Sequence, residues 1–222
     1  MNRQISPSLL SANFTRLKQD IELVEGLGVE RLHLDVMDGH FVPNLTFGPF
    51  IISQIRQVTN LHLETHLMIE NPHEYIEKYA KAGSDTIIIH YEASQDIKRD
   101  IEAIKSCNKL AGIAINPDTD YKLLNPYLGE LDYILIMSVF PGFGGQKFIE
   151  STLESMKYLS DKAQKYNITI GVDGGVNLST IDRVYDTGID ITIVGSALYG
   201  ADDVKQRYLE LINEKWSFIK FW

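Results

Sequence analysis

Eight short apolar runs alternate with longer amphipathic stretches along the whole chain, and this alternation limits the possible folds more than any other feature. The runs are rich in Ile, Leu and Val and too short to form helices, so each predicts a buried strand. Eight runs in 222 residues place a strand about every 28 residues, which leaves room for a helix in each connection between parallel strands. The runs are Gln4–Leu9, Arg31–Val36, Leu61–Met68, Asp85–His90, Leu110–Ile115, Tyr133–Ser138, Ile168–Asp173 and Asp190–Gly195.

The stretches between these runs have the apolar spacing of amphipathic helices. The clearest are Phe14–Gly26, Tyr75–Ala82 and Thr180–Thr187. Asn13, Asn71 and either Asn177 or Ser179 are their candidate N-terminal caps. Eight strand–helix units with no linker between them predict one α/β domain, residues 1–222, folded as a single closed (β/α)8 barrel, the TIM barrel. The alternative is a doubly wound open sheet, which would have fewer strands and a glycine-rich turn after the first strand.

Charge and composition narrow the classes of partner. The chain has 21 Lys and Arg against 30 Asp and Glu, a net charge of −9, which argues against sequence-independent nucleic-acid binding. No segment has the apolar length of a membrane span, and the N-terminus lacks the apolar run of a signal peptide. Cys107 is the only cysteine, so no disulfide can form within the chain. We expect a cytoplasmic protein that binds a small molecule, and an anionic ligand must be captured locally, against the overall charge.

Polar side chains interrupt three of the predicted strands. In His33-Leu34-Asp35-Val36-Met37, alternation places His33, Asp35 and Met37 on one face, and the apolar Leu34 and Val36 must face the helices. The first three side chains therefore point into the barrel, where a carboxylate needs a partner or a metal.

Two further polar residues lie near the ends of other strands. His66 is near the end of the third run, and Asp173 ends the seventh. The carboxyl ends of barrel strands carry the active site. Two imidazoles and two carboxylates, from His33, Asp35, His66 and Asp173, suit one divalent cation such as zinc, manganese, iron or cobalt. A buried His/Asp network without metal is the alternative that the spacing leaves open.

Glycines follow the last three predicted strands. Loops after the seventh and eighth strands of such a barrel commonly bind phosphate, because backbone N–H groups can approach an anion closely where side chains are absent. Taken singly, each glycine pair could be only a tight turn. The candidate phosphate-binding residues are Gly142, Phe143, Gly144, Gly145, Gly174, Gly175, Gly195 and Ser196.

Three of the five methionines, Met37, Met68 and Met137, lie at the ends of predicted strands. Methionine most often fills a core. Three on one rim can instead form an apolar lining that contacts substrate and keeps water from a reactive intermediate.

Together these residues resemble the ribulose-phosphate 3-epimerase family, over essentially the whole chain. The resemblance is carried by Ser6-Pro7-Ser8-Leu9-Leu10-Ser11, Asp35-Val36-Met37-Asp38-Gly39-His40-Phe41-Val42-Pro43-Asn44, His66-Leu67-Met68, Pro141-Gly142-Phe143-Gly144-Gly145-Gln146 and Val172-Asp173-Gly174-Gly175. It implies a metal-dependent isomerase of the pentose phosphate pathway that inverts C3 of a ketose phosphate, with D-ribulose 5-phosphate as first choice and D-allulose 6-phosphate as the alternative.

The resemblance also implies roles for particular residues. His33, Asp35, His66 and Asp173 would hold the metal, and Asp35 and Asp173 would be the acid/base pair that acts through an enediolate. Ser8 and His66 would contact the substrate, beside the three methionines. The glycine loops would hold the phosphate.

The sequence departs from the common family pattern at four places. Ser6 stands where Ala is usual, Asn13 where Asp is usual, Glu64-Thr65 where Asp-Val or Asp-Cys is usual, and Phe140 where most members have Asn. None is a ligand position, so the departures bear on the sugar rather than the chemistry. We expect the Phe140 ring to pack under the glycine loop rather than face the pocket.

Two rival functions would use the same barrel. A phosphosugar lyase or decarboxylase on the same barrel would need a Lys at a strand end, and no predicted strand has one. A non-catalytic phosphosugar sensor would not need a paired acid and base. The aromatic C-terminus, with Trp216 and Trp222, is expected to pack on the barrel or to form a contact in a homo-oligomer.

Overall fold

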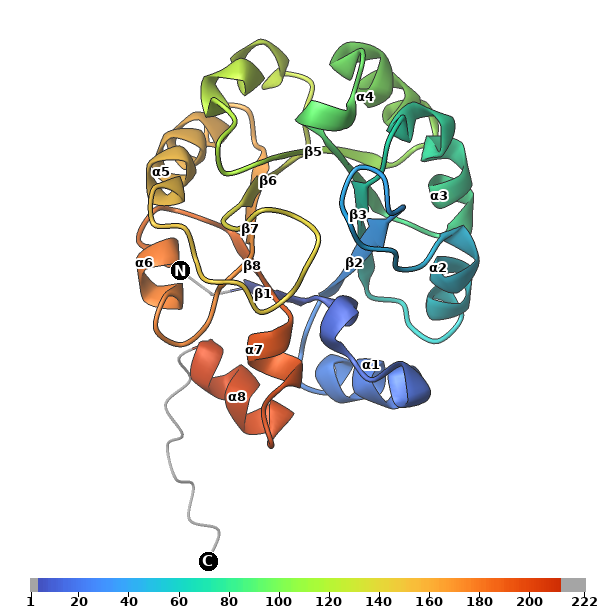
Figure 1. Cartoon of the computed structure of the whole chain (residues 1–222), viewed down its shortest axis with the longest axis vertical. Coiled ribbons are helices and arrows are strands. Elements are labelled where there is room, and N and C mark those ends of the chain that lie inside the picture. The colour runs from blue at the N-terminus through green and yellow to red at the C-terminus, as the bar shows by residue number, and fades with distance from the viewer. Residues whose placement is uncertain (1–3, 213–222) are drawn as a thin grey trace, which may run out of the picture.

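The computed structural model describes residues 4–212, and its elements follow one another as strand and helix around a barrel (Figure 1). The strands are β1 (Gln4–Pro7), β2 (Arg31–Met37), β3 (His62–Met68), β4 (Thr86–His90), β5 (Leu110–Ile115), β6 (Tyr133–Met137), β7 (Thr169–Asp173) and β8 (Ile191–Val194). The helices are α1 (Leu17–Glu25), α2 (Pro49–Arg56), α3 (Ile76–Ala82), α4 (Ile97–Ser106), α5 (Thr152–Ala163), α6 (Ile181–Tyr185), α7 (Ser196–Tyr199) and α8 (Val204–Leu211). Short 3₁₀ segments occupy Leu9–Ser11, Phe14–Arg16, Pro72–Glu74, Tyr91–Ala93 and Tyr121–Tyr127.

All eight strands are parallel, and the sheet closes on itself. Neighbouring strands pair in the order β1-β8-β7-β6-β5-β4-β3-β2. A parallel bridge between Ser8 and His33 joins the two outer strands just beyond the end of β1. The predicted (β/α)8 barrel is therefore confirmed, and the open doubly wound sheet is excluded.

The apolar side chains separate into an outer and an inner layer, as strand alternation requires. Leu34, Ile87 and Ile134 belong to the large core between strands and helices. Tyr133, Leu135 and Ile191 belong to a smaller cluster, and these positions alternate along their strands with those of the outer core. The inside of the barrel is thus packed, and polar side chains replace this filling on β2 and β3.

The helix starts differ from expectation in detail. Asn13 does accept a hydrogen bond from the Thr15 amide, but it opens the 3₁₀ segment, and α1 begins only at Leu17. Helix α6 starts after Thr180 without a side-chain cap. Asn177 Oδ1 instead accepts from the Ser179 amide at 2.8 Å in the preceding turn, because an Asn side chain competes for nearby backbone donors.

Within residues 4–212 no helix is both long enough and apolar enough to span a membrane. The aromatic C-terminal segment with Trp216 and Trp222 lies outside the described residues, so its expected packing or oligomer contact stays a prediction.

Candidate active site

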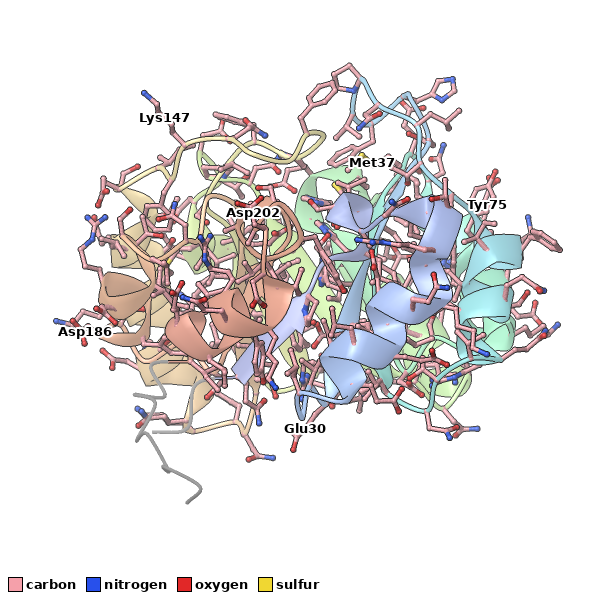
Figure 2. The ribbon with its side chains drawn as sticks, turned by 90° about the horizontal axis from the view of Figure 1, so that it is seen from below. Glu30, Met37, Tyr75, Lys147, Asp186 and Asp202 are labelled. Atoms are coloured by element: carbon pink, nitrogen blue, oxygen red, sulfur yellow. The ribbon has the colours of Figure 1, made fainter. Side chains whose placement is uncertain are left out.

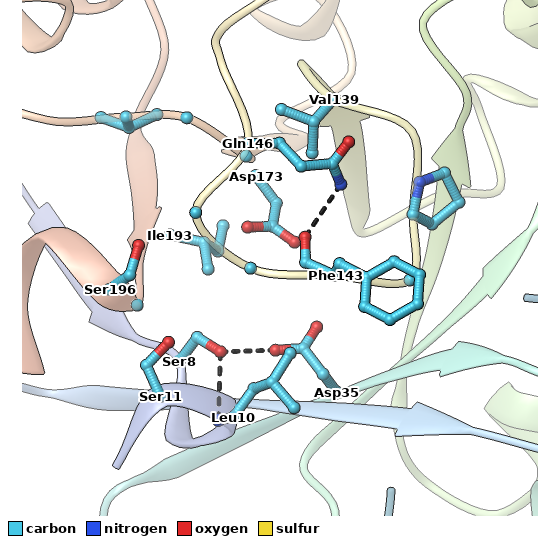
Figure 3. Close-up of a pocket in the computed structure, with 18 of the residues that line it drawn as sticks. Ser8, Leu10, Ser11, Asp35, Val139, Phe143, Gln146, Asp173, Ile193 and Ser196 are labelled. Atoms are coloured by element: carbon cyan, nitrogen blue, oxygen red, sulfur yellow. Dashed lines mark hydrogen bonds between the residues drawn. The ribbon is translucent and has the colours of Figure 1, made fainter. Parts of the chain in front are cut away.

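The candidate site is a cavity of about 230 Å³ at the carboxyl end of the barrel strands. Figure 2 shows this end from the side: Met37 ends β2 near the upper loops, and Glu30, just before β2, lies at the opposite end. Strand side chains form one wall of the cavity and the loops after β6, β7 and β8 form the other (Figure 3).

Four metal-type side chains meet at the base of this cavity. His33 and Asp35 come from β2, His66 from β3 and Asp173 from the end of β7. One ligand atom from each lies within 4.8 Å of the corresponding atoms of the others. Asp35 Oδ1 is 3.3 Å from both His33 Nε2 and His66 Nδ1. Two imidazoles and two carboxylates, all turned inward from rigid strands, fit the donor preferences of a divalent transition metal.

The two carboxylates have opposite proton affinities in this metal-free arrangement. Burial acts to raise the pKa of Asp35, but the neighbouring His33 and His66 lower it well below its usual range. For Asp173, burial and the charge of Asp35 both act in the same direction and raise the pKa to about 7. Such a divergence is typical of acid/base pairs.

The two histidines differ in the same way. Against the effect of burial, Asp35 raises the pKa of His33 to about 10. Burial lowers the pKa of His66 to about 3. Several groups thus compete for protons in one enclosed space, which a bound cation would relieve.

Ser8 holds the Asp35 carboxylate through its second oxygen, Oδ2. Its hydroxyl donates to Asp35 Oδ2 at 2.5 Å and also lines the cavity (Figure 3). Met37, Met68 and Met137 line the cavity as well and are all nearly fully buried. These methionines exclude water at the base without adding a polar group.

The opposite wall is made of backbone. Its loops contain all six candidate glycines, with Phe143 and Ser196 beside them. Gly175 has φ +64°, and a Cβ there would lie 2.5 Å from the backbone nitrogen of Phe148, so only glycine fits. Helix α7, which starts at Ser196, has four residues, so its dipole adds little and the expected anion site depends on backbone N–H groups.

The loop after β6 is braced from within and from the side. Gln146 Nε2 donates to the carbonyls of Phe140 and Phe143 at 2.7 and 2.9 Å. Asn44 Nδ2, in the loop after β2, donates to the Gly142 carbonyl at 2.7 Å. The Phe140 ring does not line the cavity and is 50% exposed, so the expected packing beneath the loop is not found.

All the predicted site residues except His33 and His66 line the cavity; those two are fully buried beneath it. Ser11, Gln146 and Asn177 also line it without being among the predicted site residues. Ser11 and Gln146 lie inside the motif segments, which could have identified them. Asn177, three residues after Gly174, could have been found only from the path of the loop.

The sequence-based prediction also missed a second imidazole, that of His90, which lies behind His66. His90 Nε2 is 2.8 Å from His66 Nε2, and His90 Nδ1 is 3.1 Å from Glu92 Oε2. His90 ends β4, and its inward position could have been inferred from alternation along that strand.

Comparison with known proteins gives a consistent result. A sequence profile described as the ribulose-phosphate 3 epimerase family matches residues 4–199. A ribulose-phosphate 3-epimerase of Bacillus subtilis is 44% identical over 215 residues, covering 96% of this chain and 99% of that protein. A chloroplastic ribulose-5-phosphate-3-epimerase of Arabidopsis thaliana is 41% identical over 90% of this chain and 72% of that protein.

Solved structures with lower identity share the fold. Orotidine 5'-phosphate decarboxylase from Pyrococcus horikoshii superposes with a TM-score of 0.67 at 16% identity, covering 95% of this chain and 98% of that one. A 3-hexulose-6-phosphate synthase superposes with a TM-score of 0.63 at 18% identity, covering 96% and 99%. At such identities the likeness shows the barrel alone.

Proposed function

The chain belongs to the ribulose-phosphate 3 epimerase family, and on that premise we propose that it interconverts D-ribulose 5-phosphate and D-xylulose 5-phosphate by inverting C3. The observation that carries the proposal is the pair Asp35 and Asp173, which line one cavity beside the two histidines of the metal-type cluster. In Figure 3 both carboxylates point into the same space. This interconversion belongs to the pentose phosphate pathway.

The reaction needs a base on one face of C3 and an acid on the other. Asp35 removes the C3 proton as the enediolate forms, and Asp173 returns a proton from the opposite side. In the reverse direction the two carboxylates exchange roles. Ser8 holds Asp35 by its second oxygen, which keeps the base oriented while it is ionised.

His33, Asp35, His66 and Asp173 are the residues that would hold one divalent cation, of zinc, manganese, iron or cobalt type. Bound there, the cation would act as a Lewis acid that stabilises negative charge on the sugar oxygens next to C3. The methionine side chains at the bottom of the cavity keep water away from this charge. The glycine loops bind the phosphate through backbone N–H groups, which explains anion capture by a chain of net charge −9.

The residues that the rival functions would need are not what the described cavity offers. No described strand ends in Lys, and no Lys lines the cavity, so a lysine-dependent lyase or decarboxylase has no catalytic group here. A sensor would not need the two carboxylates of Asp35 and Asp173 as a paired acid and base in one cavity. D-Allulose 6-phosphate remains a comparison substrate, without an observation that favours it.

Turnover in D₂O tests the proposal. The metal-loaded protein is mixed with D-ribulose 5-phosphate and followed by ¹H NMR, in parallel with D-allulose 6-phosphate and with metal-stripped protein. We expect D-xylulose 5-phosphate that carries deuterium at C3, and no turnover after stripping. Full activity of protein shown to be metal-free by elemental analysis would overturn the metal site. Loaded protein that leaves the C3 proton of both sugars in place would overturn the function.

A further inference from the structure

The two nitrogens of His33 lie in different surroundings. Nε2 faces the metal-type cluster, 3.3 Å from Asp35 Oδ1 and 3.3 Å from His66 Nδ1. Nδ1 faces away from the cavity, is fully buried and has no hydrogen-bond partner. The nearest carboxylate oxygen to Nδ1 is Glu64 Oε2, at 3.6 Å.

Glu64 is held in place from two sides. Its side chain is fully buried in the barrel, on β3. Ser6, on β1, donates its hydroxyl to Oε2 at 2.8 Å. Arg31, on β2, contacts Oε1 through Nη1 at 2.7 Å. Arg31 thus places a positive charge directly against this buried carboxylate.

A histidine that offers Nε2 to a cation carries its proton on Nδ1, and a buried N–H needs an acceptor. Glu64 Oε2 lies a few tenths of an ångström beyond hydrogen-bonding distance of that nitrogen, and it is already fixed. We propose that Ser6, Arg31 and Glu64 form a positioning unit that fixes the tautomer and ring orientation of His33 and so tightens metal binding. This inference rests on the metal site of the proposed function.

The arrangement behind His66 supports this assignment. There the cluster-facing nitrogen is Nδ1, and Nε2 reaches His90, which in turn contacts Glu92. Each candidate ligand histidine thus has its outward nitrogen directed to a carboxylate, directly for His33 and through one imidazole for His66. Outer carboxylates of this kind orient ligand histidines and raise their basicity.

The bond between Ser6 and Glu64 also joins β1 to β3. Ser6 and Glu64 are 58 residues apart in sequence, yet their side chains are directly bonded. The Ser6 hydroxyl supplies a donor that Ala could not, and it binds the carboxylate oxygen nearest to His33. We therefore expect the two side chains to act on metal affinity as one element.

Titration of the metal-stripped full-length protein with Co²⁺ tests the inference. The readouts are the dissociation constant and the visible absorption of the bound ion, which reports the ligand geometry. Glu64→Gln keeps the shape but removes the charge, and we expect roughly 10- to 100-fold weaker binding with an altered spectrum. Ser6→Ala is the milder variant, with an expected loss of roughly 3- to 10-fold, and Glu64→Asp should bind more tightly than Glu64→Gln.

Asp100→Asn is the matched control. Asp100 is also a buried carboxylate that contacts a histidine and a serine hydroxyl, His73 Nδ1 at 2.7 Å and Ser94 Oγ at 2.5 Å, but it lies on α4, outside the barrel. This variant should lower Tm while the Co²⁺ dissociation constant stays within about threefold of wild type. Ser84→Ala, at a buried serine bonded to Thr65, is the corresponding control for Ser6→Ala.

The outcomes separate the two proposals. Glu64→Gln that binds Co²⁺ within threefold of wild type, with an unchanged spectrum, overturns the positioning role and leaves the proposed function intact. Equal losses in Glu64→Gln and Asp100→Asn would also overturn it, because the effect would then be general destabilisation. Wild-type protein that binds no Co²⁺ overturns both proposals.

Discussion

The two walls of the cavity are built from different material. On the β2 and β3 side, chemistry comes from side chains: His33, Asp35 and His66 are buried and in mutual contact. On the β6 to β8 side, the wall consists largely of glycine, and Gly175 fits only because it has no side chain. The first wall requires particular side chains, whereas the second wall requires that side chains be absent.

This difference predicts different consequences of substitution. A change in the side-chain wall alters ligands or proton transfer, so it should lower kcat and metal affinity. A change in the glycine wall blocks access of the anion to backbone N–H groups, so it should raise KM and leave metal content unchanged. Kinetics and metal analysis on the same variants therefore test whether the two walls have these separate roles.

The largest effect is expected at the two carboxylates. Asp35→Asn and Asp173→Asn each remove a proton-transfer group and a proposed ligand. The loss in kcat should therefore exceed the roughly 10²–10⁴-fold of one general acid or base. The measurement is kcat for D-ribulose 5-phosphate with the metal content of each variant determined in parallel. A variant that keeps a tenth of the wild-type kcat would show that its carboxylate is not part of the reaction.

A smaller effect is expected at Gly145. Its φ is +74°, and an added Cβ would have open space, with Ser196 Oγ the nearest atom at 4.0 Å. Gly145→Ala should raise KM by roughly 10- to 100-fold, a loss of about 1.4–2.7 kcal/mol, with metal content and kcat nearly unchanged. Steady-state kinetics with D-ribulose 5-phosphate and with unphosphorylated D-ribulose provide the measurement.

Gly28→Ala is the matched control for Gly145→Ala. Gly28 has φ +85° and open space around its Cβ position, but it lies just before β2, away from the cavity. Both alanines carry similar backbone strain, so both should lower Tm by similar amounts. If Gly28→Ala raised KM as much as Gly145→Ala, the effect would come from strain and not from the phosphate site.

The same contrast explains what could be predicted from the sequence. The strands were predictable because alternation and length are local properties, and His33, Asp35 and Met37 lie on one face by a period of two. The glycines showed where the loops lie in the sequence, but they did not predict the loop conformation. That conformation depends on distant contacts such as the one between Asn44 and the Gly142 carbonyl. The Ser6–Glu64 contact likewise depends on barrel closure, which joins segments far apart in sequence.

The pH dependence of stability tests the side-chain wall without catalysis. Asp35 raises the pKa of His33 to about 10, despite burial, and the pKa of Asp173 is raised to about 7. Both folded-state values lie above those of the unfolded chain, so the folded metal-free protein binds more protons. Stability is therefore lost as pH rises from about 4 to 7 through Asp173 and from about 6.5 to 10 through His33. A bound cation replaces these protons and should remove the loss.

Thermal unfolding at pH 7 and pH 9 measures this effect. Between these values, metal-stripped protein should lose roughly 5 °C more in Tm than metal-loaded protein. The loaded protein is the control, since all other titrating groups are common to both forms. Parallel pH slopes for the two forms would contradict the assignment of His33 as the proton-binding partner of Asp35.

The smallest effect is expected at Phe140, which lies within the glycine wall in sequence but does not line the cavity. Val139 and Pro141 line the cavity, whereas the Phe140 ring does not and is half exposed. The contact that Phe140 makes with the loop is through its carbonyl, which accepts from Gln146, and any residue would keep that bond.

Phe140→Asn should therefore change the ratio of kcat/KM for D-ribulose 5-phosphate and D-allulose 6-phosphate by less than about threefold, under 1 kcal/mol. Gln146→Ala, which removes the brace itself, should raise KM for both sugar phosphates alike. A tenfold or greater change in the ratio on Phe140→Asn would mean that the ring reaches the bound sugar, and the glycine wall would then have to include it.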